Sequence, residues 1–329
     1  MSENIDLYFD KNYGKLYEKA DQGKQEIFVY EDENGRITNQ FLKREIKDKI
    51  DGQVFFDLIT PYGYGGPIIE KLVKNKEQLL ENYEKAFSKY CMENNIVSEF
   101  VRFHPIIKNY EDFEKMYNAK YMRKTLGTNL EKYEDPVQNE FSKSCRKEIR
   151  RVLNSGVEYR VTEKPENLEE FKRIYYLNME RKNATEYYFF DDEYFNNIIR
   201  FYKDNLILVE AIYKEKTIAA GLYFLYNGII HVHLSGTDTN FLNLSPAYVL
   251  KYGTVLWGKE HGYKLIHYGG GLSNSEDDSL YCFKRKFAKT TDFDFYIGKK
   301  IWNQEIYDKL CELKQIDKCE EFFPAYRKS

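Results

Sequence analysis

Two periods of hydrophobic residues alternate along the chain, one of about two residues and one of about 3.6, and together they predict an α+β fold. In the first half, the segment 26–46 predicts two strands that turn at Asn34-Gly35, a dipeptide typical of hairpins. Residues 75–95 carry apolar side chains at helical spacing and predict an amphipathic helix. Further strands are expected at 53–60, 96–103 and 121–130.

The second half repeats this alternation at greater length. A basic segment at 139–156 predicts a helix that Gly156 ends. The other expected helices lie at 166–182, 191–203, 245–262, 278–287 and 303–316. The expected strands lie at 157–162, 205–213, 216–226, 228–237, 264–270 and 292–298.

The order of these elements is more informative than their exact bounds. Both halves contain a three-strand antiparallel meander, then a helix, then a further strand. Asp135-Pro136 interrupts the pattern between them. The sequence therefore predicts two α+β domains built on one plan, 1–137 and 138–329.

Composition limits the classes of function. The chain has 329 residues, 42% of them hydrophobic, and a net charge of −3, so a sizeable core is expected and a large nucleic-acid footprint is not favoured. Its five cysteines contain no Cys-x-x-Cys pair, so neither a disulfide framework nor a zinc site is indicated. The N-terminal segment lacks the pattern of a signal peptide, and no apolar run is long enough to span a bilayer. We therefore expect a cytoplasmic protein without membrane insertion.

One segment near the end of the chain carries a family resemblance. Residues 269–288, GGGLSNSEDDSLYCFKRKFA, resemble the segment that closes the second domain of the Fem family, with the shared core at Asp277–Lys284. The motifs SKSCRKEIRR, NMERKN and GTDTNFLNLSPAYVL precede this segment and fall in matching order. Fem proteins are peptidoglycan bridge-forming ligases that move an amino acid from aminoacyl-tRNA to a precursor amine. The resemblance covers roughly residues 96–300 and is weak over the first 60.

The resemblance implies two tandem GNAT-like (acyl-CoA N-acyltransferase) domains, with mixed sheets flanked by helices and a substrate cleft between the halves. The same fold is similar to sugar N-acyltransferases. We therefore predict transfer of an acyl group from acyl-CoA, as co-substrate, to the primary amine of a nucleotide-linked amino sugar. The alternative is a Fem-type ligase that uses aminoacyl-tRNA, and a binding module without activity is a third reading. The chain lacks the coiled-coil arm of some Fem ligases, and His104 stands where small Fem ligases tend to have Asp.

Two residues are candidates for the chemistry of amide formation. His104, at the end of a strand, has the side chain best suited to take a proton near neutral pH, although a structural histidine before Pro105 is the alternative. Lys284 matches a Fem lysine that faces the reacting centre or a phosphate. A lysine on an aromatic helix is otherwise often a surface residue with an extended side chain.

Other residues are candidates for binding the acceptor. The loop 61–67, PYGYGGP, offers Tyr62 and Tyr64 as stacking surfaces and Gly65 as a point of close approach, or it is only a turn. Arg181 matches a Fem arginine that grips the diphosphate of the nucleotide precursor. Asp238 orients the amine or caps a turn.

Candidates for the acyl-donor site lie around the start of the helix at 245–262. They are Gly236, Ser245, Ala247 and Tyr248, because a helix N-terminus presents N–H groups to a pyrophosphate. The usual GNAT pyrophosphate signature is missing, so the donor assignment rests on the fold. His231 and His233 share one face of a strand, where packing is a better reading than metal binding, and no metal is predicted. The basic residues of 139–156 hold nucleotide or tRNA phosphates, or form a solvated helix face.

Overall fold

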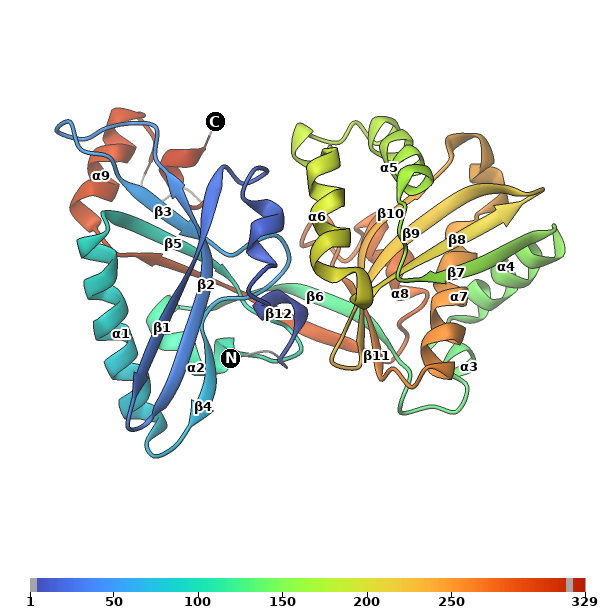
Figure 1. Cartoon of the computed structure of the whole chain (residues 1–329), viewed down its shortest axis with the longest axis horizontal. Helices are drawn as coiled ribbons and strands as arrows, with labels where there is room; N and C mark the ends of the chain where they lie inside the picture. Colours follow the sequence, from blue (N-terminus) through green and yellow to red (C-terminus); the bar gives the residue numbers. More distant parts are fainter. Residues whose placement is uncertain (1–4, 318–321, 329) are drawn as a thin grey trace. The chain divides into compact units, whose positions relative to one another are not determined.

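The computed structural model describes residues 5–317 and 322–328, and the chain folds into two compact units (Figure 1). Unit 1 consists of Met1–Met122 together with Asp294–Ser329. Unit 2 consists of Arg123–Phe293. Each unit is α+β, with a mixed sheet and flanking helices, which confirms the predicted fold class.

Unit 1 is built on the strand order β1-β2-β3-β5-β12, with β4 paired to β2. The pairs are antiparallel except for β3 with β5, which is parallel. Its strands are β1 (Gly23–Asp32), β2 (Gly35–Glu45), β3 (Phe56–Ile59), β4 (Ile68–Leu72), β5 (Ile96–Arg102) and the end of β12 (Asp292–Ile301). Its helices are α1 (Lys76–Glu93), α2 (Tyr110–Tyr117) and α9 (Gln304–Leu313).

Unit 2 follows the same plan in the strand order β7-β8-β9-β10-β11-β6. Again one pair, β10 with β11, is parallel, and a helix connects its strands. The strands are β6 (Lys120–Asn129), β7 (Val157–Glu163), β8 (Leu206–Tyr213), β9 (Lys216–Tyr226), β10 (Ile229–Thr237) and β11 (Leu265–Gly269). The helices are α3 (Pro136–Glu140), α4 (Lys143–Asn154), α5 (Glu169–Arg181), α6 (Asp192–Tyr202), α7 (Ala247–Glu260) and α8 (Ser279–Arg285).

The last strand of each repeat is exchanged. β6 follows β5 in the chain but pairs with β11 of unit 2, whereas β12 follows β11 but pairs with β5 of unit 1. The division therefore differs from the expected single boundary near residue 138, and the chain from residue 294 onward belongs to unit 1. Hydrophobic periodicity indicates where strands form but not which strands they pair with. The exchange of β6 and β12 could therefore not be predicted from it.

Two elements differ from the expected pattern for local reasons. The predicted helix 139–156 is two helices, because Phe141 is extended and the Ser142 side chain caps α4 through the amide of Cys145. The short strand β4 follows the glycine-rich loop and was not predicted.

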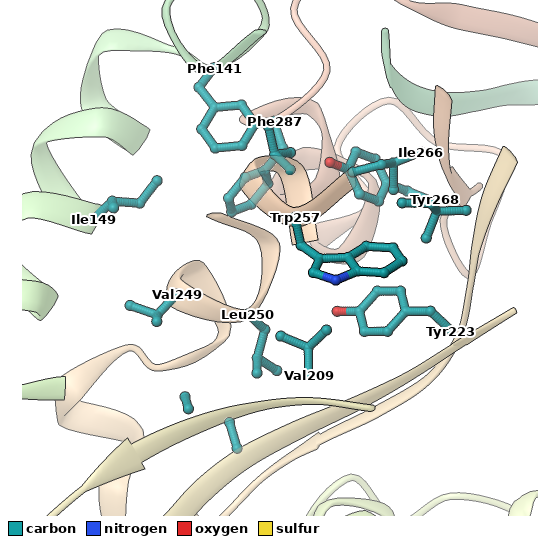
Figure 2. Close-up of a cluster of buried hydrophobic side chains, with 14 of the residues drawn as sticks. Phe141, Ile149, Val209, Tyr223, Val249, Leu250, Trp257, Ile266, Tyr268 and Phe287 are labelled. Atoms are coloured by element: carbon teal, nitrogen blue, oxygen red, sulfur yellow. The ribbon is translucent and has the colours of Figure 1, made fainter. Parts of the chain in front are cut away.

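The core of unit 2 lies between the sheet and the helices α4, α7 and α8. Figure 2 shows part of it, with Tyr223, Trp257, Tyr268 and Phe287 among the buried side chains. Alternation along β9 places Tyr223 on this face, and its neighbour Phe224 packs on the opposite face against Tyr202 of α6. The sheet is therefore covered on both faces.

Unit 1 contains a buried carboxyl group in its own core. Glu99 of β5 is 1% exposed and accepts hydrogen bonds from Asn39 Nδ2 (2.9 Å), Tyr117 Oη (2.9 Å) and Trp302 Nε1 (3.2 Å). Burial raises the pKa of Glu99 to about 7, although these three hydrogen bonds oppose the shift. The group therefore titrates near neutral pH.

Candidate active site

The predicted residues of unit 1 come together around the loop 61–67. The Tyr64 ring lies 5.7 Å from the His104 ring, and Tyr8 contacts both at 5.2 and 5.6 Å between ring centroids. Tyr62 packs on Tyr17 at 5.6 Å, and its carbonyl oxygen accepts a hydrogen bond from the Tyr13 hydroxyl. These tyrosines belong to a packed aromatic cluster.

The glycine-rich loop is fixed by the protein itself. Asn109 Nδ2 donates to the carbonyl oxygens of Gly65 and Pro67, both at 2.9 Å, and its Oδ1 accepts from the His104 amide at 2.8 Å. Gly66 has φ +82°, and a Cβ there would lie 2.4 Å from a Val101 methyl group. Gly66 is therefore explained by close packing of the loop against β5.

His104 occupies a structural environment. Its side chain is 0% exposed, Nδ1 accepts from the amides of Ile106 and Ile107, and Nε2 lies 3.3 Å from a carboxylate oxygen of Asp6. A general base must come within hydrogen-bond reach of the proton it removes. This placement does not favour the predicted role of His104 as base, because both ring nitrogens face protein groups inside unit 1.

In unit 2, the two central strands part at a defined point. β10 and β11 pair only from Ile229 with Leu265 to His231 with His267, and β10 then continues against β9 as far as Thr237. β11 has an irregularity against β6 between His267 and Gly269. The chain beyond Tyr268 therefore leaves the β10 ladder, so backbone groups there are available to other partners.

Lys284 lies at this point. The helix α8 carries it, and its Nζ donates to the carbonyl oxygen of Gly270 at 2.6 Å. The side chain is partly buried, and burial lowers the pKa of Lys284 to about 8; the charge of Asp278 opposes this shift, and those of Lys182 and Arg123 add to it. The ammonium is thus fixed beside the end of β11 and is held mostly by a neutral acceptor.

The acidic run before α8 is largely structural. Asp278 caps the helix through the amide of Tyr281 at 2.8 Å and accepts from the amides of Leu272 and Ser273 at 3.0 and 2.9 Å. These hydrogen bonds close the loop after the glycines. The loop and its carboxylate therefore position Lys284.

Arg181, Gly236 and Asp238 lie on or against α5. The Arg181 side chain is exposed and contacts Asn178 of its own helix at 3.0 Å. A Cβ on Gly236 would lie 2.7 Å from the carbonyl oxygen of Ile174, so this glycine permits helix-to-strand packing. Asp238 is 1% exposed, caps the following turn through Asn240 and pairs with Lys216 at 3.0 Å. Gly236 is therefore explained by close packing, and Asp238 by its hydrogen bond and its ion pair.

The start of α7 differs from the expectation. Ser245 adopts a left-handed conformation with φ +56°, and the helix begins at Ala247. The amides of Tyr248 and Val249 donate to the carbonyl oxygens of Ser245 and Pro246, so they are not available to a pyrophosphate. Tyr248 instead packs on Phe283 of α8 at 5.3 Å, which places it beside the helix that carries Lys284.

The histidines of the sheet pack with protein groups. His233 Nε2 lies 2.6 Å from the Tyr194 hydroxyl, and His267 Nε2 lies 3.0 Å from Thr125 Oγ1. Burial and then the charge of His231 lower the pKa of His233 to about 3. Across residues 5–317 and 322–328, no group of three or more His, Cys, Asp or Glu side chains is placed to hold a metal ion.

A hollow of about 440 Å³ lies on unit 2 but away from these residues. Its lining, which includes Lys172, Arg173 and Asp192, belongs to α5 and α6. Lys172 there is already paired with Asp192 at 2.6 Å. The hollow is therefore a poor candidate for the reacting centre.

Sequence reasoning missed Lys251. This residue of α7 is 7% exposed, and its Nζ lies 4.8 Å from the centroid of the Tyr268 ring and 5.7 Å from that of Tyr223. A signal was present, because Lys251 stands three and four residues from Tyr248 and Val255, on the inward face of an otherwise apolar helix.

Comparisons with known proteins agree with this architecture. Residues 139–279 match the model of the acetyltransferase (GNAT) domain family. The crystal structure of FemX superposes with a TM-score of 0.68 and 13% identity, covering 93% of this chain and 94% of that one. The structure of L-PGS from Bacillus licheniformis superposes with a TM-score of 0.56 and 13% identity, covering 93% of this chain and 95% of that one. These two likenesses show the fold.

A sequence relative bears on the activity. The chain is 27% identical over 173 residues to the UDP-N-acetylmuramoylpentapeptide-lysine N(6)-alanyltransferase of Weissella viridescens. The match covers 52% of this chain and about half the length of that relative. The predicted transfer from acyl-CoA to a nucleotide-linked amino sugar is therefore wrong, and the Fem-type alternative agrees better with this relative.

None of the described helices combines the length and the apolar character that crossing a bilayer requires. Residues 139–279 are assigned to the acetyltransferase (GNAT) domain family by the match to its model. The chain is similar to the Weissella viridescens alanyltransferase in sequence and to FemX in fold.

Proposed function

We propose that this protein is a Fem-type ligase that transfers an amino acid from aminoacyl-tRNA to a side-chain amine of a peptidoglycan precursor. The observation that carries the proposal is the similarity to an alanyltransferase named for the lysine of UDP-N-acetylmuramoylpentapeptide. The placement of Lys284 supports it, because the resemblance to Fem ligases implies that this lysine faces the reacting centre or a phosphate, and a fixed ammonium suits either contact.

The reaction requires the amine to attack the ester carbonyl carbon of the donor. The C–N bond forms, a tetrahedral intermediate carries negative charge on the former carbonyl oxygen, and the C–O bond to the ribose then breaks. A cation fixed before the reaction stabilises that oxygen without reorganisation. Lys284, held by Gly270 and by the loop that Asp278 closes, would supply this cation.

A basic surface in unit 2 supports a donor with a phosphate backbone. Lys143, Lys147 and Arg150 are exposed and lie at spacings of four and three residues, so they share the outer face of α4. Among the residues that the structure describes, none of these three has an ion-pair partner, whereas Arg151 pairs with Glu148 at 2.7 Å. A single tRNA strand running over this face would release counterions from its phosphates.

We therefore expect the combined change Lys143→Gln, Lys147→Gln and Arg150→Gln to weaken aminoacyl-tRNA binding. It should also reduce the slope of log Kd against log salt by up to about 2 to 3. Fluorescence titration at several salt concentrations measures both quantities. Lys85→Gln with Lys89→Gln, on exposed positions of α1, serves as the matched control. An unchanged slope in the triple variant would show that α4 does not contact the donor.

A further inference from the structure

The attacking amine must lose a proton, and His104, buried within unit 1, is not placed to accept it. Lys251 belongs to α7, and its Nζ lies over the rings of Tyr223 and Tyr268, two core residues labelled in Figure 2. Tyr268 is the last residue of β11 before the glycines, and its hydroxyl hydrogen-bonds to Thr128 Oγ1 at 2.6 Å. Lys251 therefore reaches the same strand end as Lys284.

The environment of Lys251 disfavours its charged form. Among the described residues, no hydrogen-bond acceptor and no carboxylate contacts its Nζ, and the residue is 7% exposed and lies against two aromatic rings. The ionisable groups that face it are Tyr223 of β9, Tyr268 of β11 and Lys284 of α8. Burial, and then the charge of Lys284, lower the pKa of Lys251 to about 7. A large fraction of the side chain is thus a neutral amine at physiological pH.

Other basic groups near the strand end are already engaged. Asp278 accepts three backbone amides, and these hydrogen bonds hold its pKa below the usual value although burial opposes them. His233 has a pKa of about 3 and contacts the Tyr194 hydroxyl. Lys284 donates to Gly270. These three groups are therefore committed to protein contacts, whereas no hydrogen bond or ion pair joins Lys251 Nζ to another described residue.

We propose that Lys251 is the proton acceptor for the attacking amine, and that it forms a functional pair with Lys284; this inference rests on the proposed aminoacyl transfer. The substrate ammonium gives one proton to the neutral Lys251 amine and becomes nucleophilic. The nitrogen then attacks the ester carbonyl carbon, and its second proton passes to the ribose oxygen as the C–O bond breaks. Lys251 returns its proton to solvent, while Lys284 stays protonated beside the oxyanion.

The pair predicts a bell-shaped pH dependence of kcat/KM, with limbs near pH 7 and pH 8 that belong to the two coupled lysines. Lys251→Met should lower kcat/KM about 10²- to 10⁴-fold and remove the acidic limb. Lys251→Arg should be equally slow, because a guanidinium keeps its proton at these pH values. Lys264→Met, on an exposed lysine of the same unit, should leave rate and profile unchanged.

The assay uses the full chain, aminoacyl-tRNA and a lysine-containing UDP-N-acetylmuramoylpentapeptide, and thermal unfolding checks that each variant is folded. No product with the unaltered protein would overturn the proposed function itself, and this inference with it. If the unaltered protein forms product, the Lys251→Met variant tests the role of Lys251 alone. A variant whose kcat/KM stays within about threefold of the unaltered protein, and whose pH profile keeps the acidic limb, would overturn that role. If Lys251→Met fails to fold, two other measurements test the role of Lys251. The proposal is contradicted if the pH profile of the unaltered protein has no acidic limb, or if the Lys251→Arg variant is active.

Discussion

Replacing Lys284 by Met is expected to lower kcat/KM for aminoacyl transfer about 10²- to 10³-fold, the usual loss when one oxyanion-stabilising group is removed. The physical reason is that the Lys284 ammonium is fixed before the reaction by Gly270 and by the capped loop that precedes α8. Methionine preserves the apolar stem and its packing but carries no charge. Single-turnover kinetics with the proposed substrates measure the effect.

The matched control is Lys289→Met, because Lys289 is an exposed lysine shortly after the same helix. We expect this control to react like the unaltered protein. Lys284→Arg should recover little activity, since the larger planar group does not reproduce the contact with Gly270. Full activity in folded Lys284→Met would show that this lysine is not part of the reacting centre.

Replacing Glu99 by Gln is expected to remove a pH dependence of stability from unit 1. The folded pKa of Glu99 is about 7, whereas the unfolded carboxyl group has a pKa near its ordinary value of 4.5. Between these values the folded state keeps a proton that the unfolded state has released. The contribution of Glu99 to the free energy of unfolding therefore falls as pH rises through this window, by up to about 3 kcal/mol in total.

The glutamine variant should be close to the unaltered protein at pH 4.5 and more stable than it at pH 8. The Asn39 amide can turn its oxygen toward the new amide group. Urea denaturation at several pH values gives the difference between the two proteins, and taking that difference cancels groups such as His233 that titrate in both. Glu81→Gln, at an exposed position of α1, should give a flat difference. A flat difference for Glu99→Gln would contradict the raised pKa.

Much of the architecture could be predicted because strands and helices each have a characteristic spacing of hydrophobic residues along the chain. The meander, the helix and a further strand recur in both units, and the strand and helix patterns identified them; that the further strand pairs in parallel comes from the structure. The exchange of β6 and β12 could not be predicted in this way, because pairing partners are chosen by tertiary packing. The same limit explains why the segment after residue 293 was assigned to the second domain.

The candidate site was predictable only where a motif fixed the position of a residue. Lys284 followed from the run at Asp277–Lys284, and the structure places it at the end of β11. For His104, the prediction depended on burial, which the sequence does not show. The pattern His-Pro does not reveal that both ring nitrogens of His104 contact protein groups inside a core. Lys251 was overlooked because a lysine in an apolar helix is usually expected to extend to the surface.

The most direct test of aminoacyl transfer is the mass of the acceptor. The protein is incubated with a pool of aminoacylated tRNAs and a lysine-containing UDP-N-acetylmuramoylpentapeptide, and the precursor is then examined by mass spectrometry. We predict a mass increase of one amino-acid residue, located on the lysine side-chain amine, and no increase when acetyl-CoA replaces the tRNA pool. An unmodified precursor with every aminoacyl-tRNA, or an acyl group gained from the CoA thioester instead, would contradict the proposed function.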